Sequence, residues 1–261
     1  MTFAQRLTEI TAFAHRGLHN IDAAIVENSP KAITMAMDAG LGIEIDVQMS
    51  RDLVPMVFHD ETLARLTDRD ERLNFLSADE ISGVSYSVGG DKIISLADCL
   101  SMIAGKVPLL IEVKSHWTGT AEMERSILDI CSQFSGQLGI MSFDPSVIQR
   151  FRSLDCKWPL GMVTSQLPAK RWSGLSEEER ALGKVQFESA RQRKVDFLAH
   201  DIADIENEYM RGLVKELDIP LFSWTITSGS EMDYARKNGA IPIAEFNWSD
   251  KLGCADFANL I

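Results

Sequence analysis

Eight short apolar runs alternate with helical patterns along the 261-residue chain, and this alternation is the strongest constraint on its fold. Strands interleaved with helices indicate a parallel sheet, because a parallel connection needs a crossover of a dozen or more residues. At this length we expect an α/β fold, a closed TIM (β/α)8 barrel. A doubly wound open sheet is the alternative, but no G-x-G-x-x-G turn supports it. The runs are residues 12–16, 42–48, 109–114, 138–143, 159–164, 195–199, 220–226 and 240–245.

A ninth run, residues 54–60, follows the second run too closely for a parallel crossover. We therefore expect an antiparallel hairpin over 47–60 that projects beyond the barrel. The hairpin would return His59 and Asp60 to the end where the second strand leaves the barrel. The polar residues 61–92 would then form a small insertion within a single barrel domain spanning 1–261.

The charge of the chain limits its partners. It carries 26 Lys and Arg against 38 Asp and Glu, and the net charge of −12 argues against a nucleic-acid partner but not against one small anion. No stretch approaches the roughly 18 apolar residues of a membrane span, and MTFAQRLTEI does not resemble a signal peptide. The four cysteines lack metal-type spacing, so we expect free thiols and a cytoplasmic protein. The oligomeric state cannot be read from the sequence.

Carboxylates alternate with apolar residues in the predicted strand GIEIDV, residues 42–47. Because side chains alternate between the faces of a strand, Glu44 and Asp46 share one face and Ile43 and Ile45 the other. A barrel strand is covered on both faces, so two carboxylates on one face are costly unless they are paired or bind a metal.

The run LLIEVKS, residues 109–115, repeats the pattern and places Glu112 and Lys114 on one face. Three carboxylates converging beside one lysine predict a site for one divalent cation, Mg²⁺ or Ca²⁺, because both ions prefer oxygen ligands. The alternative is a buried salt-bridge network, which barrels also contain.

Two histidines and an arginine are predicted at the same end of the barrel. His15 and His59 fall at the carboxyl ends of their runs, where barrel enzymes keep their active sites, and Arg16 adjoins the first of them. A lone histidine is more often structural, but two beside a carboxylate cluster favour catalysis.

Five motifs together resemble the glycerophosphodiester phosphodiesterase family in order and spacing. The resemblance runs from residue 13 to about 245, and Ser142-Phe143 and residues 223–226 add weaker support. It implies a TIM barrel with an insertion after the His-Asp pair, as the runs predict. The motifs are H-R-G at 15–17, E-N at 27–28, E-I-D-V at 44–47, V-P-x-V-x-H-D at 54–60 and I-E-V-K at 111–114.

The resemblance implies a metal-dependent hydrolysis of glycerophosphodiesters to sn-glycerol 3-phosphate and an alcohol. His15 and His59 would act as general base and acid. Arg16 and Lys114 would hold the phosphate oxygens, and Trp224 would face the glycerol.

The family also implies the ligands of the cation, which would be Glu44, Asp46 and Glu112. Glu27, at the E-N position, would support the metal side of the pocket, whereas Asn28 would help to begin the following helix.

Several expectations concern the rim of the site. The last strand ends in Ala244-Glu245, where family members often have Thr-Asp, so we carry over no contact from that strand. Strand alternation points Trp224 inward together with Phe222 and Ile226. His116 follows Lys114 closely enough to reach the pocket, whereas His19 and His200 are expected in loops or behind the site.

Two alternatives to this function stay open. The same barrel could cleave lysophospholipids or sugar phosphodiesters. It could also be a catalytically inactive barrel that binds a phosphorylated ligand, but neither a metal carboxylate nor a histidine of the motifs is missing.

Overall fold

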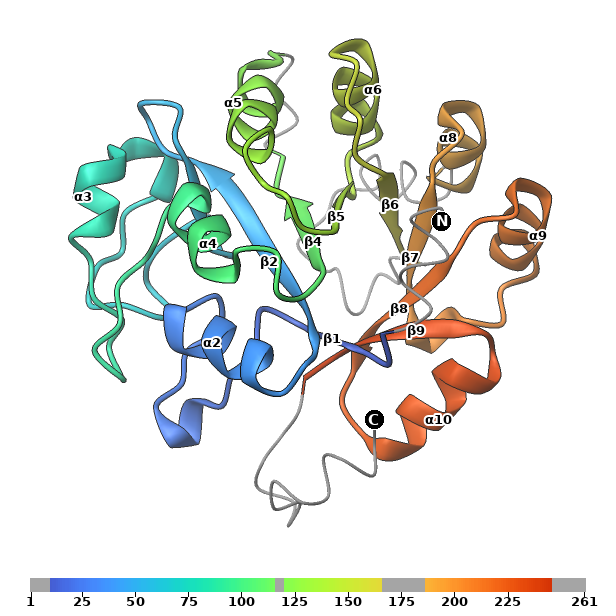
Figure 1. Ribbon diagram of the computed structural model, residues 1–261, viewed down its shortest axis with the longest axis horizontal. Helices are drawn as coiled ribbons and strands as arrows, with labels where there is room; N and C mark the ends of the chain where they lie inside the picture. The colour runs from blue at the N-terminus through green and yellow to red at the C-terminus, as the bar shows by residue number, and fades with distance from the viewer. Residues whose placement is uncertain (1–9, 116–119, 166–185, 246–261) are drawn as a thin grey trace.

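The computed structural model, which describes residues 10–115, 120–165 and 186–245, forms a closed parallel barrel (Figure 1). Strand β1 pairs in parallel with both β2 and β9, and this double pairing closes the sheet. Each of the eight predicted runs overlaps one of these strands, and the sheet is closed, so the TIM barrel is confirmed and the open sheet is excluded. The barrel strands are β1 (Phe13–Ala14), β2 (Gly42–Met49), β4 (Leu109–Val113), β5 (Leu138–Ser142), β6 (Leu160–Thr164), β7 (Phe197–Asp201), β8 (Leu221–Ile226) and β9 (Ala240–Ala244).

Helices surround the barrel (Figure 1). Two of them begin as the sequence indicates, with a side-chain cap followed by proline: Ser29 accepts from the Ala32 amide, and Asp144 accepts from the Ser146 amide. The described α-helices are α2 (Pro30–Asp38), α3 (Ala78–Ser82), α4 (Leu96–Ile103), α5 (Glu122–Cys131), α6 (Pro145–Ser153), α8 (Gln186–Arg193), α9 (Glu208–Leu217) and α10 (Gly229–Lys237). The 3₁₀ helices are η1 (Ile21–Ala23), η2 (Leu73–Phe75) and η3 (Ile202–Asp204).

Aromatic rings fill the interior of the barrel. Phe222 packs edge-to-face against Phe13 and Phe197, with ring centroids 5.6 and 5.3 Å away. Gly42 and Gly161 make room for these rings, since a Cβ there would lie 2.6 Å from the Phe13 ring and 2.2 Å from the Phe197 ring. This packed interior leaves the polar side chains of β2 and β4 to gather toward the carboxyl ends of the strands.

The predicted hairpin is present. Strand β3 (Pro55–Val57) runs antiparallel to β2, with Val57 opposite Val47, and the Phe58 amide donates to the carbonyl of Asp46 at 3.0 Å. The Gln48 side chain donates to the carbonyls of Phe58 and Asp60 at 3.0 and 2.7 Å. These bonds bring His59, between them, back beside the carboxyl half of β2.

Residues 61–92 contribute Leu63, Leu73, Ile81 and Tyr86 to a small apolar cluster that they share with the hairpin. The Tyr86 ring stacks on Phe58 at 6.4 Å, and this contact anchors the segment to the hairpin. Within the described ranges, no helix has both the length and the apolar character to cross a bilayer.

Candidate active site

Three buried carboxylates form the centre of the site. Glu44 and Asp46 project from β2, and Glu112 projects from β4, where it lies in register with Asp46. Each side chain offers one oxygen, and these three oxygens lie within 4.8 Å of one another. The structure therefore brings together the three acids that strand alternation placed on one face.

The electrostatics of this triad favour a bound cation. Burial, followed by the nearby charges of Asp46 and Glu112, raises the pKa of Glu44 well above its usual value. Glu44 Oε2 accepts from the Arg16 amide at 3.0 Å, but the buried Oε1 has no hydrogen-bond partner among the described residues. A salt-bridge network alone thus leaves Glu44 Oε1 without a partner in the described part of the chain. A cation that prefers oxygen ligands would supply the missing interaction.

Two cations already lie against the triad. Lys114 Nζ lies 2.9 Å from Asp46 Oδ1 and also pairs with Glu112, while Arg16 Nε lies 3.3 Å from Asp46 Oδ2. Burial alone would raise the pKa of Asp46, but the charges of Lys114, His59 and Arg16 outweigh burial and lower it. Arg16 and Lys114 therefore both lie against the acids, which partly satisfy their charges.

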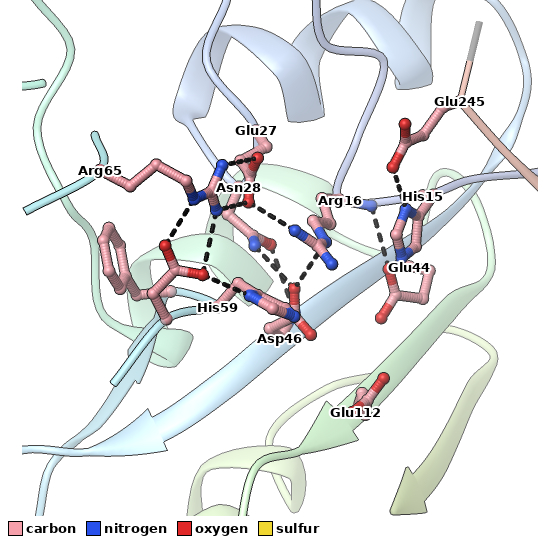
Figure 2. Close-up of polar contacts among 12 residues, drawn as sticks. His15, Arg16, Glu27, Asn28, Glu44, Asp46, His59, Arg65, Glu112 and Glu245 are labelled. Carbon is pink, nitrogen blue, oxygen red and sulfur yellow. Dashed lines mark hydrogen bonds and ion pairs between the residues drawn. The ribbon is translucent and has the colours of Figure 1, made fainter. Parts of the chain in front are cut away.

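Each of the two predicted histidines pairs with a carboxylate through Nδ1 (Figure 2). His15 Nδ1 lies 2.8 Å from Glu245 Oε1, and His59 Nδ1 lies 2.6 Å from Asp60 Oδ1. His15 Nε2 lies 3.9 Å from Glu44 Oε2. A carboxylate that accepts from Nδ1–H leaves Nε2 as the nitrogen that can exchange a proton with another group.

Sharp backbone turns after β1 deliver His15 and Arg16 to the site. Arg16 and Gly17 have φ of 56° and 76°, in the left-handed region. A Cβ on Gly17 would lie 2.9 Å from the Ala32 carbonyl carbon, so glycine is required for close packing of this turn on α2.

The expectation that Asn28 begins the helix is wrong, because Ser29 caps it. The buried Asn28 side chain instead brackets Asp46: Nδ2 donates to Asp46 Oδ2 at 2.9 Å, and Oδ1 accepts from the Asp46 amide at 3.2 Å. One signal in the sequence could have indicated this role. The Ser-Pro pair already supplies a helix start, so the preceding asparagine is available for another contact.

Glu245 makes the second contact in the candidate site that sequence reasoning missed. Barrel closure sets β9 beside β1, so the residue after β9 lies next to the residue after β1. Glu245 therefore reaches His15, and the hydrogen bond from His15 is the main reason why the pKa of Glu245 is lowered.

Trp224 lies near the carboxyl end of β8. In the closed sheet, β8 lies across the barrel from β4, which carries Glu112. Its Nε1 donates to the Ala199 carbonyl at 3.1 Å, and its ring meets Phe143 edge-to-face at 5.5 Å. Phe222 and Trp224 pack with the barrel interior as expected, but Ile226 packs with the outer core. The β8–β9 register shifts between Ser223 and Ile226, which reverses the alternation beyond that point.

Two of the remaining histidines lie within the described residues. His200 is fully buried in β7, where Nδ1 lies 2.8 Å from Thr164 Oγ1, so it is a strand residue and not a loop residue. His19 is half-buried in the loop after β1, and burial lowers its pKa. His116 lies outside the described residues.

Comparison with known proteins assigns the chain to a family. The sequence model described as "Glycerophosphoryl diester phosphodiesterase family" matches residues 15–244. The chain belongs to that family. The resemblance seen in the motifs is thereby confirmed.

Relatives and solved structures agree with the family assignment. Glycerophosphodiester phosphodiesterase 1 of Bos taurus is 29% identical over 74% of this chain and 58% of its own length. The putative glycerophosphodiester phosphodiesterase YhdW of Bacillus subtilis is 31% identical over 58% of this chain and 64% of its own length. The matches thus span less than two thirds of these relatives.

The fold agrees with solved structures of lower identity. A phosphodiesterase from Oleispira antarctica, solved with the product sn-glycerol-3-phosphate, aligns at a TM-score of 0.73 with 19% identity, over 90% of this chain and 92% of that one. A Thermotoga maritima glycerophosphodiester phosphodiesterase aligns at 0.68 with 22% identity, over 90% and 94%.

The Glu27 carboxylate should make the free energy of unfolding depend on pH in the acid range. Burial would raise its pKa, but hydrogen bonds from Arg65 and the charge of Arg16 outweigh burial and lower the pKa from 4.5 to about 2. The contribution of this carboxylate is therefore fully present above pH 4.5 and is lost as pH falls toward 2. We expect the unfolding free energies of the wild type and Glu27→Gln to differ most above pH 5 and to converge by up to about 3 kcal/mol toward pH 2.

The measurement is denaturant unfolding of metal-free protein between pH 2 and 7. Glu71→Gln is the control, because the Glu71 pair with Arg69 is exposed and screened by solvent. Unfolding free energies of the wild type and Glu27→Gln that stay parallel over this range would contradict the prediction.

Proposed function

We propose that this chain is a metal-dependent glycerophosphodiester phosphodiesterase that releases sn-glycerol 3-phosphate and an alcohol. The observation that carries the proposal is the buried triad of Glu44, Asp46 and Glu112, flanked by two histidines that are each held by a carboxylate. Family membership supports the substrate class. We further propose that residues 1–261 act as one barrel domain with 61–92 as an insertion, and that the free thiols of Cys99, Cys131 and Cys156 support a cytoplasmic location.

Glu44, Asp46 and Glu112 would hold one divalent cation, Mg²⁺ or Ca²⁺. When bound, the cation would neutralise phosphate charge and stabilise the charge that develops on the phosphoryl oxygens. The half-satisfied Glu44 carboxylate supports this ligand set.

The side chains of the chain supply the proton transfers and the grip on phosphate. His15 and His59 each keep Nε2 available, so one can accept a proton from the attacking hydroxyl while the other donates one to the departing alcohol. Arg16 and Lys114, already beside Asp46, would share their donors with the phosphate oxygens. Trp224 and Phe143 offer apolar surface to the glycerol carbons.

The test is phosphorus NMR of a mixed pool of glycerophosphodiesters and lysophospholipids incubated with the protein and Mg²⁺ or Ca²⁺. We expect glycerol 3-phosphate to accumulate from the soluble diesters. No turnover of any member would reject the proposal and favour the inactive ligand-binding barrel.

Lysophospholipids are the second candidate substrate that we propose. Four exposed large apolar side chains lie in the segments that follow β1 and β2, namely Ile21, Leu53, Phe75 and Val88. If these four side chains gather on one face, they would offer a contact surface for an acyl chain. Faster turnover of lysolipids than of glycerophosphocholine in the pool would select this alternative.

Loss of either histidine should slow the chemical step. Because proton transfer by a positioned side chain typically contributes about 10²- to 10⁴-fold, His15→Ala and His59→Ala should each lower kcat by that factor. The wild-type pH profile should be bell-shaped, and each variant should lose one of its limbs. Stopped assays of kcat across pH, with melting temperature as the folding control, measure this. A variant that keeps near wild-type kcat removes that histidine from the mechanism.

A further inference from the structure

Arg65, in the insertion, grips two carboxylates at once (Figure 2). Nη1 and Nη2 donate to the two Glu27 oxygens at 2.8 and 2.7 Å. Nε and Nη2 donate to the two Asp60 oxygens at 2.5 and 3.1 Å. One planar guanidinium thus joins the loop before α2 to the end of the hairpin.

Each gripped carboxylate also contacts a residue of the proposed machinery. Asp60 Oδ1 pairs with His59 Nδ1 at 2.6 Å, and Glu27 Oε1 accepts from Arg16 Nη1 at 2.7 Å. A continuous series of contacts therefore runs from His59 through Asp60, Arg65 and Glu27 to Arg16.

We propose that Arg65 is a positioning residue that fixes the orientation of His59 by holding Asp60, so that residues beyond the hairpin contribute to catalysis. This inference rests on the proposed function, because it assigns a role within the same reaction. Among the described residues, the Asp60 carboxylate has two side-chain partners, His59 and Arg65. Without Arg65, the Asp60 carboxylate would keep, of these two partners, only its contact with His59. It could then rotate together with the imidazole and would no longer fix the orientation of the ring.

Glu27 depends less on Arg65 than Asp60 does. It is more deeply buried, with 11% of its side chain exposed against 24% for Asp60, and it keeps its bond to Arg16. The effect of losing Arg65 should therefore pass mainly through His59 and lower kcat more than it changes KM.

Lysine cannot replace Arg65 in this role. A guanidinium presents five donors in a fixed plane and serves two carboxylates bidentately, whereas an ammonium is a point charge without that geometry. Arg65→Lys would keep the charge that fastens the insertion but lose the plane that orients Asp60. This difference separates positioning from simple attachment of the insertion.

The experiment compares Arg65→Lys and Arg65→Ala with the matched control Arg72→Ala. Arg72 lies in the same insertion and pairs with Glu61 at 2.9 Å, and its side chain is 46% exposed against 47% for Arg65. We expect both Arg65 variants to lose about 10- to 100-fold in kcat, as partners that orient a reacting group typically do, with KM changed by less than about 3-fold. Both Arg65 variants should melt below the wild type, because Arg65 supplies part of the stabilisation of the largely buried Glu27 carboxylate, so kcat and KM are measured well below their melting temperatures. Arg72→Ala should keep wild-type kinetics.

A double-mutant cycle tests the route through Asp60. If Arg65 acts by holding Asp60, Arg65→Ala combined with Asp60→Asn should be no slower than Asp60→Asn alone, within about 3-fold, because coupled residues are not additive. Additive losses, or an Arg65→Lys variant with wild-type kcat, would overturn the proposal.

A spectroscopic readout keeps the inference independent of turnover. In histidine-¹⁵N NMR spectra, the His59 Nδ1–H signal should shift or broaden in both Arg65 variants and stay unchanged in Arg72→Ala. If the wild type hydrolyses no diester, the proposed function fails and this signal alone decides the role of Arg65. An unchanged His59 signal in both Arg65 variants overturns it.

Discussion

Removal of divalent cations should abolish hydrolysis of glycerophosphodiesters, and Mg²⁺ or Ca²⁺ should restore it. The three buried carboxylates converge within 4.8 Å, while the described cations beside them, Arg16 and Lys114, leave Glu44 Oε1 without a partner. The site lacks the positive charge needed to bind a dianionic transition state unless a cation is present. The measurement is the initial rate after dialysis against chelator, with each metal then added in excess. Full activity in excess chelator would exclude the metal role.

Stability gives a second view of the same site. A cation that binds the folded form preferentially should raise the melting temperature, by the equivalent of about 2.7 kcal/mol at 100 times its Kd. Glu44→Gln is the control variant, because it removes one proposed ligand of the cation. Because the pKa of Glu44 is raised in the folded protein, ionising this group there costs stability at neutral pH, so the variant should melt higher than the wild type without metal. It should also lose most of the gain on adding metal. A metal-induced gain that survives in Glu44→Gln would show that the cation binds elsewhere.

Periodicity explains why the barrel and its acid face were readable from sequence. A period of two sets Glu44 and Asp46 on the face opposite Ile43 and Ile45, and the structure packs the isoleucines with the outer core. The connection between the second run and the ninth is too short for a parallel crossover. The length of this connection alone therefore predicted the hairpin. Parallel pairing of β2 with β4 then brought Glu112 beside Asp46.

Contacts between loops were not readable in this way. Arg65 meets Glu27 across a sequence separation of 38 residues, and His15 meets Glu245 across 230. Such pairs depend on how turns are docked, which no local periodicity encodes. Ile226 was predicted to point inward, and this prediction is wrong for a different reason. Strand alternation holds up to Trp224, but a register shift between β8 and β9 reverses it before Ile226. The roles of the site residues therefore stay predictions, although their positions are now known.

The route of attack should depend on one hydroxyl of the substrate. Glycerol carries a 2-hydroxyl next to the phosphorylated carbon, so this oxygen is already held beside phosphorus. Well-oriented intramolecular nucleophiles reach effective molarities of about 10⁵–10⁸ M. We therefore expect the 2-hydroxyl to attack first, with one histidine taking its proton as the other protonates the departing alcohol oxygen. The P–O bond to the alcohol breaks, a cyclic glycerol phosphate forms, and water then opens the ring with the histidine roles reversed.

Two substrates of equal charge test this route. Glycerophosphocholine should turn over, whereas its analogue lacking the 2-hydroxyl should bind with a similar affinity and react slower by about 10⁴-fold or more, because only the internal nucleophile has been removed. Phosphorus NMR measures both rates and would reveal the cyclic phosphate as a transient signal, and competition by the analogue reports its binding. Contact of Trp224 with the glycerol carbons should hold the hydroxyl in line, so Trp224→Ala should slow glycerophosphocholine far more than it slows the analogue. Comparable kcat for the two substrates would mean that water attacks phosphorus directly. Arg16, Lys114 and the carboxylate triad would keep their proposed roles in that case, because charge develops on the same phosphoryl oxygens by either route.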